Sequence, residues 1–178
     1  MRIYFLLFFL VSVLPSLHAQ YKTIQSLRVQ FQIKNAGIKV DGSFSKASAV
    51  VSVDPRNILN STFTGTVQVA SVHTGNTERD AHLRDKEEFF NVKKFPIITF
   101  KSLSVKKSSF KDSYKVEWLL TMKGISKKVS TDVLIAPTQG SVLLVCVFNL
   151  NRLDWKVGNP SLTLSNDVMI TLNCTVTP

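Results

Sequence analysis

The side chains with the widest chemical repertoire gather in one charged segment near the middle of the chain. His73, Asp80 and His82 offer two imidazoles and a carboxylate, which are groups that bind zinc, but their spacing matches no common metal signature. A general acid and a general base must face the same site. Glu87 and Glu88 are adjacent, and adjacent residues on a helix need not face the same way. The sequence contains neither a glycine-rich phosphate loop nor a Gly-x-Ser-x-Gly elbow. These residues predict no metal site and no catalytic site.

The same segment has the residue types that bind a polar head group. Arginine suits a phosphate-type head because its guanidinium fork can bond two oxygens. One interpretation is that these charges pair with one another and pin the segment to the fold, and the other is that some of them line the mouth of a pocket. We assign the mouth to His82, Arg84, Phe89 and Phe90, and a structural polar network to Arg79, Asp80, Arg152 and Asp154.

Alternation of apolar and polar residues indicates the elements that position these side chains. Val29, Phe31 and Ile33 alternate with polar residues, and the same period of two recurs in residues 66–69, 116–122, 129–135, 148–154 and 168–174. Residues that favour turns separate these runs. About eight strands with short connections are typical of an all-β sandwich or closed barrel. Residues 78–92 depart from the alternation and predict a short helix, capped by Asn76 or Thr77.

Large apolar side chains recur at the inward positions of the predicted strands. They are Phe31, Phe44, Phe100, Trp118, Met122 and Phe148. An eight-stranded barrel can be packed solid with such side chains or can hold one small ligand. Periodicity alone leaves these two interiors open.

The first 19 residues have the layout of a secretory signal peptide. Arg2 supplies a positive charge, residues 3–14 are almost wholly apolar, Pro15 breaks the run, and Ala19 is a small residue at the predicted cleavage site. An uncleaved membrane anchor is the alternative, but the run is shorter than the ~20 residues that a spanning helix needs. We therefore expect an exported protein, periplasmic or secreted, whose residues 20–178 form one domain.

The formal net charge of +10 does not point to nucleic acid. The lysines and arginines are spread over the chain, and no arginine-rich arm or basic helix accompanies them. Export makes a nucleic acid partner improbable. A solvated basic surface and a surface that contacts an anionic membrane both remain open.

The two cysteines lie in the last third of the chain. Cys146 and Cys174 flank a turn near residues 158–160, and a hairpin symmetric about Pro160 would place them opposite each other. An exported protein permits a disulfide between them. A single bulge would spoil that register, so the sequence leaves a disulfide and two free thiols equally open.

Several motifs together resemble the YceI-like family. The most specific are residues 71–84 (SVHTGNTERDAHLR), 89–92 (FFNV) and 95–100 (FPIITF). Further matches are residues 29–34, 42–44, 120–129 (LTMKGISKKV) and 148–155 (FNLNRLDW), so the resemblance covers nearly all of residues 20–178.

The resemblance implies a lipocalin-like eight-stranded antiparallel β-barrel with a short helix between strands, usually exported to the periplasm. Some family members hold a polyisoprenoid or isoprenoid-quinone chain in the barrel. Asn35 stands where the family often has histidine, and a glycine that the family often has near Ala49 is missing, which implies a different mouth or ligand preference.

Our leading hypothesis is a carrier or sequestering protein that holds a long apolar lipid of isoprenoid type, with no cofactor beyond that lipid. A filled barrel acting as an envelope stress or interaction protein is the first alternative. An isomerase or cyclase working inside the barrel is the second, and an unpaired cavity carboxylate would favour it. Edge strands also leave room for a homodimer.

Overall fold

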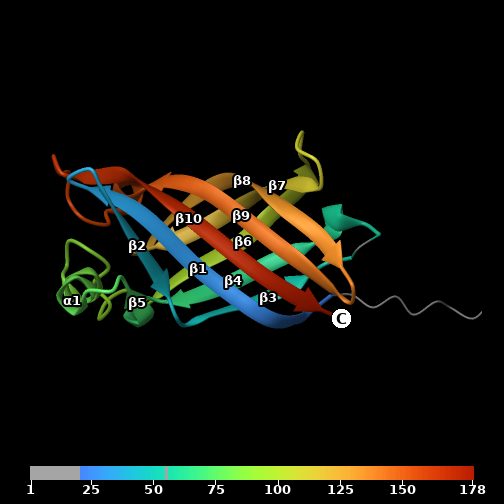
Figure 1. The fold of residues 1–178 in the computed structure, drawn as a ribbon, viewed down its shortest axis with the longest axis horizontal. Helices are drawn as coiled ribbons and strands as arrows, with labels where there is room; N and C mark the ends of the chain where they lie inside the picture. Colours follow the sequence, from blue (N-terminus) through green and yellow to red (C-terminus); the bar gives the residue numbers. More distant parts are fainter. Residues whose placement is uncertain (1–20, 55) are drawn as a thin grey trace, which may run out of the picture.

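The structure is a computed structural model that describes residues 21–54 and 56–178, so the predicted signal peptide lies outside the described residues. Those residues form one ten-stranded antiparallel sheet with the order β3-β4-β6-β7-β8-β9-β10-β1-β2-β5 (Figure 1). The strands are β1 (Thr23–Asn35), β2 (Ile38–Phe44), β3 (Ala47–Ser52), β4 (Thr62–Gln68), β5 (Val72–His73), β6 (Ile97–Lys107), β7 (Ser113–Met122), β8 (Ile125–Thr138), β9 (Ser141–Asn151) and β10 (Leu164–Thr177). Three short 3-10 helices, η1 (Ile58–Asn60), η2 (Val69–Ser71) and η3 (Arg152–Trp155), and one α-helix complete the fold.

The predicted barrel is confirmed, but its strands number ten and not eight. The difference arises where β2 and β3 follow each other across Ser45 and Lys46. β2 pairs with β1, whereas β3 pairs with β4, so this bent segment belongs to both ends of the sheet and curls it into a barrel. The bent segment counts as two strands, and the two-residue β5, which pairs with the end of β2, is the other addition.

The helix α1 (Thr77–Asp85) is shorter than the predicted 78–92. Asn76 caps it, and its side-chain oxygen accepts a hydrogen bond from the backbone N–H of Arg79 at 2.9 Å. Lys86 is extended and ends the helix, after which the chain turns back and the Phe90 N–H donates to the carbonyl of Leu83. None of the helices in the described part of the chain has the length and apolar character needed to cross a membrane.

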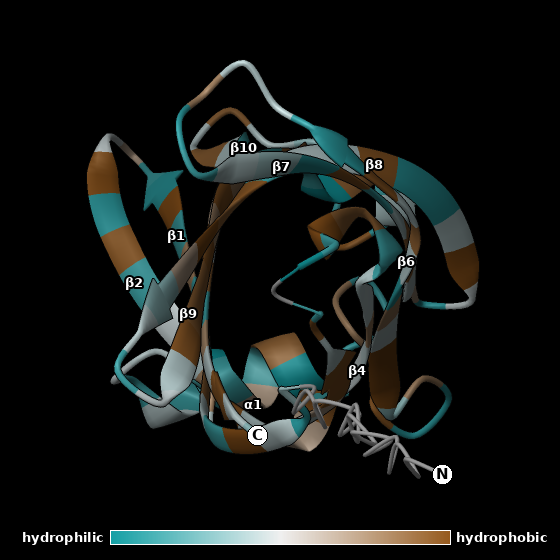
Figure 2. Cartoon of the chain, turned by 90° about the vertical axis from the view of Figure 1, so that its right-hand side faces the viewer, coloured by the Kyte–Doolittle hydropathy of each residue, from teal (hydrophilic) through white to brown (hydrophobic). Residues whose placement is uncertain are grey.

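The interior divides into two halves along the barrel axis, which Figure 2 shows almost end-on as a ring of strands. One buried cluster is a packed plug built from short side chains such as Val53, Val116, Val142 and Val176, with Phe63 among them. The other cluster lies toward α1, and its buried members include Val67, Phe90, Met122 and Trp155. The sequence did not distinguish a filled barrel from a hollow one. The structure has both features, because one half of the interior is packed and the half toward α1 is hollow.

Candidate ligand-binding cavity

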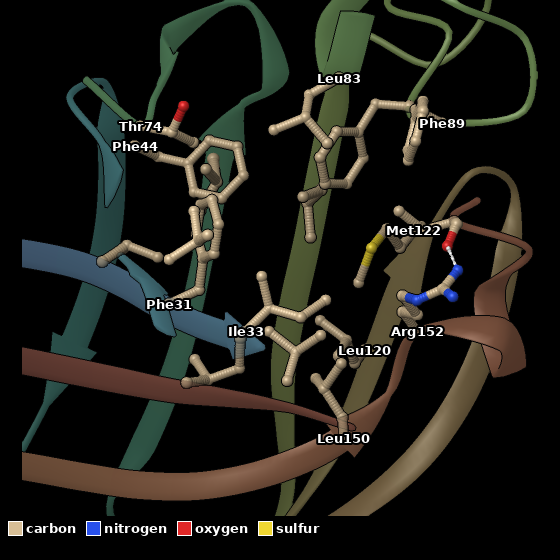
Figure 3. Close-up of a pocket in the computed structure, with 18 of the residues that line it drawn as sticks. Phe31, Ile33, Phe44, Thr74, Leu83, Phe89, Leu120, Met122, Leu150 and Arg152 are labelled. Atoms are coloured by element: carbon tan, nitrogen blue, oxygen red, sulfur yellow. Dashed lines mark hydrogen bonds between the residues drawn. The ribbon is translucent and has the colours of Figure 1, made fainter. Parts of the chain in front are cut away.

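The hollow half contains a cavity of about 480 Å³ with an almost wholly apolar lining. That volume lies within the ~300–1,000 Å³ that is usual for small-molecule sites. Side chains from β1, β2, β6, β7, β9 and β10 converge on it, and Figure 3 shows several of them pointing into one common space. All six apolar positions predicted from strand alternation line this cavity, namely Phe31, Phe44, Phe100, Trp118, Met122 and Phe148.

Two glycines keep the lumen open. Gly42 on β2 lies opposite Phe31 on β1, and Gly65 on β4 lies opposite Phe100 on β6. In each pair the phenylalanine ring covers the glycine, so that a Cβ atom on Gly42 or Gly65 would lie 2.1 or 2.2 Å from the ring's Cζ atom. The rings can therefore lie against the wall, which leaves the centre of the barrel free.

The floor of the cavity is the indole of Trp118. It packs against Phe63 of the plug, with ring centroids 5.7 Å apart, and edge-on against Phe100 at 6.0 Å. Its N–H donates to the hydroxyl of Thr131 at 2.8 Å, which satisfies the polar atom of a large and partly buried side chain. The floor is thus fixed by packing on one side and by a hydrogen bond on the other.

The polar residues of the cavity lining come from the end near α1. They are Asn35, Thr74, Asn76, Glu78, Arg79, His82 and Arg152. Of the four residues predicted for the mouth, His82, Phe89 and Phe90 line the cavity. Arg84 does not, because its guanidinium turns away to form a bidentate pair with Asp85 at 2.7 and 2.9 Å. This exposed pair raises the pKa of Arg84 and lowers the pKa of Asp85.

Arg79 and Asp80 do not pair with each other but converge on Thr74. Asp80 is buried and accepts hydrogen bonds from the Thr74 N–H at 2.8 Å and from its hydroxyl at 2.6 Å. Arg79 donates to the Thr74 hydroxyl and carbonyl, each at 2.7 Å. His73 completes the group with Nδ1 3.3 Å from the Asp80 carboxylate. This arrangement ties the first turn of α1 to the strand end at β5 and so fixes one side of the opening.

The metal ligands considered from the sequence do not meet at one point. His82 lies 4.0 Å from Glu78, whereas Asp80 faces His73. Within residues 21–54 and 56–178, no group of three or more side chains has the arrangement of a metal site.

Arg152 is a buried cation beside the cavity and has three main-chain carbonyl acceptors. It begins the 3-10 helix η3, so the prediction that strand alternation continues through residues 148–154 is wrong beyond Asn151. Its guanidinium donates to the carbonyls of Val157 at 2.9 Å, Ser165 at 2.8 Å and Leu164 at 3.3 Å. Burial lowers the pKa of Arg152.

Asp154 does not belong to the same group of charges. It is exposed and forms an ion pair with Lys127 at 2.7 Å. The four residues assigned to one polar network therefore lie in three separate places. Arg79 and Asp80 hold α1, Arg152 holds the loop before β10, and Asp154 lies on the surface.

Both cysteines are free and buried. The register of β9 and β10 places Cys146 opposite Leu172 and Cys174 opposite Leu144, so the two thiols are offset by two residues. The pairing of β9 with β10 is symmetric about Asn159 and not about Pro160. This offset is why the symmetric register, and the disulfide that it permitted, are not found.

Burial should make both thiols unreactive in the folded protein. It raises the pKa of Cys146 and of Cys174 to about 11, so very little thiolate exists at pH 8. We expect a thiol reagent such as Ellman's reagent to label neither cysteine in the native protein and both after denaturation. The same pKa shift makes the free energy of unfolding depend on pH. An unfolded thiol loses its proton near pH 9, so the stability that the buried neutral thiols contribute is complete below pH 9 and declines as the pH rises toward 11. Rapid labelling of the native protein at pH 8 would contradict the prediction.

The sequence of this chain is similar to those of known proteins. The family model for the YceI-like domain matches residues 22–176. A UPF0312 protein of Pectobacterium atrosepticum is 36% identical over 127 residues, which are 69% of this chain and 65% of the relative. The chain therefore spans somewhat less than two thirds of that relative's length.

Solved structures share the fold. BcnA of Burkholderia cenocepacia superposes with a TM-score of 0.80 at 24% identity, covering 85% of this chain and 96% of that one. A domain of Saccharophagus degradans described as polyisoprenoid binding superposes with a TM-score of 0.67 at 12% identity, covering 89% of this chain and 98% of that one. The family match spans almost the whole described barrel, and the chain belongs to the YceI-like domain family.

Proposed function

We propose that this protein is an exported carrier that binds a long apolar lipid of isoprenoid type inside its barrel. The observation that supports this most directly is the apolar cavity, which is hollow toward α1 and closed by Trp118 and the packed plug at its other end. The polyisoprenoid-binding description of the Saccharophagus domain supports the same class of ligand.

The cavity lining explains how such a lipid would be held. Burial of apolar lipid surface contributes roughly 25 cal/mol per Å² to the binding free energy. Because this contribution does not depend on the orientation of the groups, the cavity selects a chain by its length and width. The polar rim then distinguishes the head group. Asn76, Arg79 and His82 on the α1 side and Asn35 on the strand side offer hydrogen bonds to a head that stays at the opening.

The alternatives have less support. A filled barrel does not fit a cavity of about 480 Å³. An enzyme of the isomerase or cyclase class needs an acid or base close to a buried substrate. Among the cavity-lining residues that the structure describes, Glu78 is the single carboxylate, and its side chain is 82% exposed. A binding protein therefore accounts for more of the site than an enzyme does.

Native mass spectrometry of the protein expressed with its N-terminal segment tests the proposal. We expect an intact chain that begins at Gln20 and carries an additional mass of extractable lipid. The protein stripped of lipid should take up an added isoprenoid quinone. Protein that is always free of lipid, and that takes none up, would refute the proposal.

A matched pair of variants locates the bound lipid. Leu120 points into the cavity, whereas its neighbour Leu119 lies on the outer surface of the same strand. We expect Leu120→Trp to abolish lipid uptake because the indole fills the lumen, and Leu119→Trp to leave uptake unchanged. Equal behaviour of the two variants would place the lipid outside the barrel.

A further inference from the structure

Two large aliphatic side chains project into solvent from two connections that are tied together. Ile38, where β2 begins, is 70% exposed, and Leu162, in the loop before β10, is fully exposed. The backbone N–H of Ala36 donates to the carbonyl of Thr163 at 2.8 Å, which joins the β1–β2 turn to that loop. Single exposed aliphatic side chains are common on soluble proteins and need no function. Whether these two have a function therefore depends on where they lie.

Both side chains lie beside the opening of the cavity. Asn35 and Val40, which flank the β1–β2 turn, line the cavity, and so does Leu164, two residues after Leu162. Figure 1 shows the β1–β2 turn and the start of β10 at the same end of the barrel as α1. The opening therefore has a polar rim on α1 and, across from it, a rim that projects apolar side chains.

The apolar rim is also positively charged. Residues 34–39 and 156–163 include three lysines, Lys34, Lys39 and Lys156, and no acidic residue. Lys34 and Lys39 lie directly opposite each other on β1 and β2, an arrangement of like charges that destabilises a strand pair. Among the described residues, neither lysine has a carboxylate within ion-pair distance.

Among the described residues, the acids near this surface form no ion pair with its lysines. The nearest acid along the hairpin, Asp41, accepts a hydrogen bond from Gln32 at 2.7 Å. Residues 77–96, which form the α1 side of the opening, have as many acidic as basic residues. The side of the opening that exposes the aliphatics therefore has a local excess of lysines, although Asp41 lies two residues from Lys39 and the main chain of Glu88 accepts a hydrogen bond from the Gly158 N–H.

We propose that this surface, the docking lip formed by Lys34, Ile38, Lys39, Lys156 and Leu162, binds an anionic lipid bilayer. The aliphatic side chains insert among the acyl chains, and the lysines bind the phosphates of the head groups. Docking in this orientation brings the cavity opening to the membrane, so that an apolar chain passes between bilayer and barrel without crossing water. The inference goes beyond cargo binding and does not require it.

Co-sedimentation with vesicles tests the proposal. Vesicles of phosphatidylcholine with about 30% phosphatidylglycerol should bind the protein, and vesicles of phosphatidylcholine alone should bind it weakly. We expect the double variants Ile38→Ser/Leu162→Ser and Lys34→Gln/Lys39→Gln each to bind anionic vesicles about tenfold more weakly. Rising salt should weaken the wild type more than the lysine variant.

The opposite end of the barrel supplies matched controls. Phe110, which is 65% exposed in the β6–β7 turn, and Lys106 and Lys107 at the end of β6 lie away from α1 (Figure 1). Phe110→Ser and Lys106→Gln/Lys107→Gln should bind vesicles as the wild type does. Equal losses at both ends would overturn the proposal.

Two further measurements distinguish membrane docking from self-association and from cargo binding. Light scattering that shows a dimer, converted to a monomer by Ile38→Ser/Leu162→Ser, would mean that a second copy covers the lip and would also overturn the proposal. Native mass spectrometry of each variant separates docking from cargo binding. Lip variants that lose vesicle binding but take up added quinone support the docking proposal, whereas a protein that docks but never holds lipid would refute only the proposed function.

Discussion

Replacing Arg152 with methionine is expected to lower the free energy of unfolding by about 2 to 4 kcal/mol, because one buried and two partly buried carbonyls lose their shared donor and an unsatisfied buried polar group costs roughly 1 to 3 kcal/mol. Val157, Leu164 and Ser165 supply these carbonyls, and together they fix the loop before β10 against η3. The guanidinium is also packed closely, since a Cβ atom on Gly158 would lie 2.7 Å from its Nη1 atom. Urea denaturation followed by tryptophan fluorescence measures the effect, because Trp155 lies in the same 3-10 helix.

Two variants control this experiment. Arg84→Met removes an exposed arginine and should leave the urea midpoint close to that of the wild type. Arg152→Lys keeps the charge but loses the planar fork, so its stability should lie between those of the wild type and Arg152→Met. If Arg152→Met and Arg84→Met unfold at the same urea concentration, the carbonyl contacts do not stabilise the fold as described.

Gly65→Ala is expected to weaken lipid uptake by about tenfold, because the ring of Phe100 must leave the barrel wall and enter the lumen. The new methyl carbon would otherwise lie 2.2 Å from the ring's Cζ atom. Phe100 has space to move inward because it borders the cavity. The fold should survive, since the displaced ring fills a void. Titration of stripped protein with an isoprenoid quinone measures the loss.

A second substitution provides the decisive control. Phe100→Leu in the Gly65→Ala background removes the displaced ring and should restore uptake toward that of the single variant Phe100→Leu. Recovery would show that the glycine acts through the ring opposite it. Uptake that is unaffected by Gly65→Ala, or a loss that Phe100→Leu does not relieve, would contradict the proposed wall arrangement.

The apolar wall residues of the cavity were predictable from the sequence because they recur with the strand period of two. Inward positions of a strand alternate strictly, so the positions of Phe31, Phe100 and Phe148 on the cavity wall follow from their parity. A cap at the start of α1 was also predictable from the acidic residues of the first turn, although the sequence left Asn76 and Thr77 as alternatives and the structure selects Asn76. Whether the interior was hollow was not predictable, because it depends on which residues face each other across strands. Gly65 opens the wall only because the register places it opposite Phe100.

Contacts with the main chain were the least visible in the sequence. We assigned Arg152 to a polar network with Asp154, but its guanidinium donates mainly to main-chain carbonyls, with the side-chain oxygen of Asn166 as a more distant acceptor at 3.4 Å. Arg84 was assigned to the mouth because of its neighbours in sequence. Its Nε and Nη2 atoms instead donate to the two carboxylate oxygens of the adjacent Asp85. The expected cysteine register also failed. The strands pair about Asn159, one residue away from the expected centre, and a shift of one residue in the centre moves Cys146 two residues away from Cys174.

The bend at Ser45 and Lys46 also bears on self-association. Because one covalent segment belongs to both ends of the sheet, each end presents only a short stretch of unpaired backbone, along β2 or along the six residues of β3. Lys39 and Asp41 place charges on the β2 edge, which disfavours the addition of a foreign strand. The described barrel thus has little exposed strand edge from which a fibril or a strand-exchanged oligomer could grow.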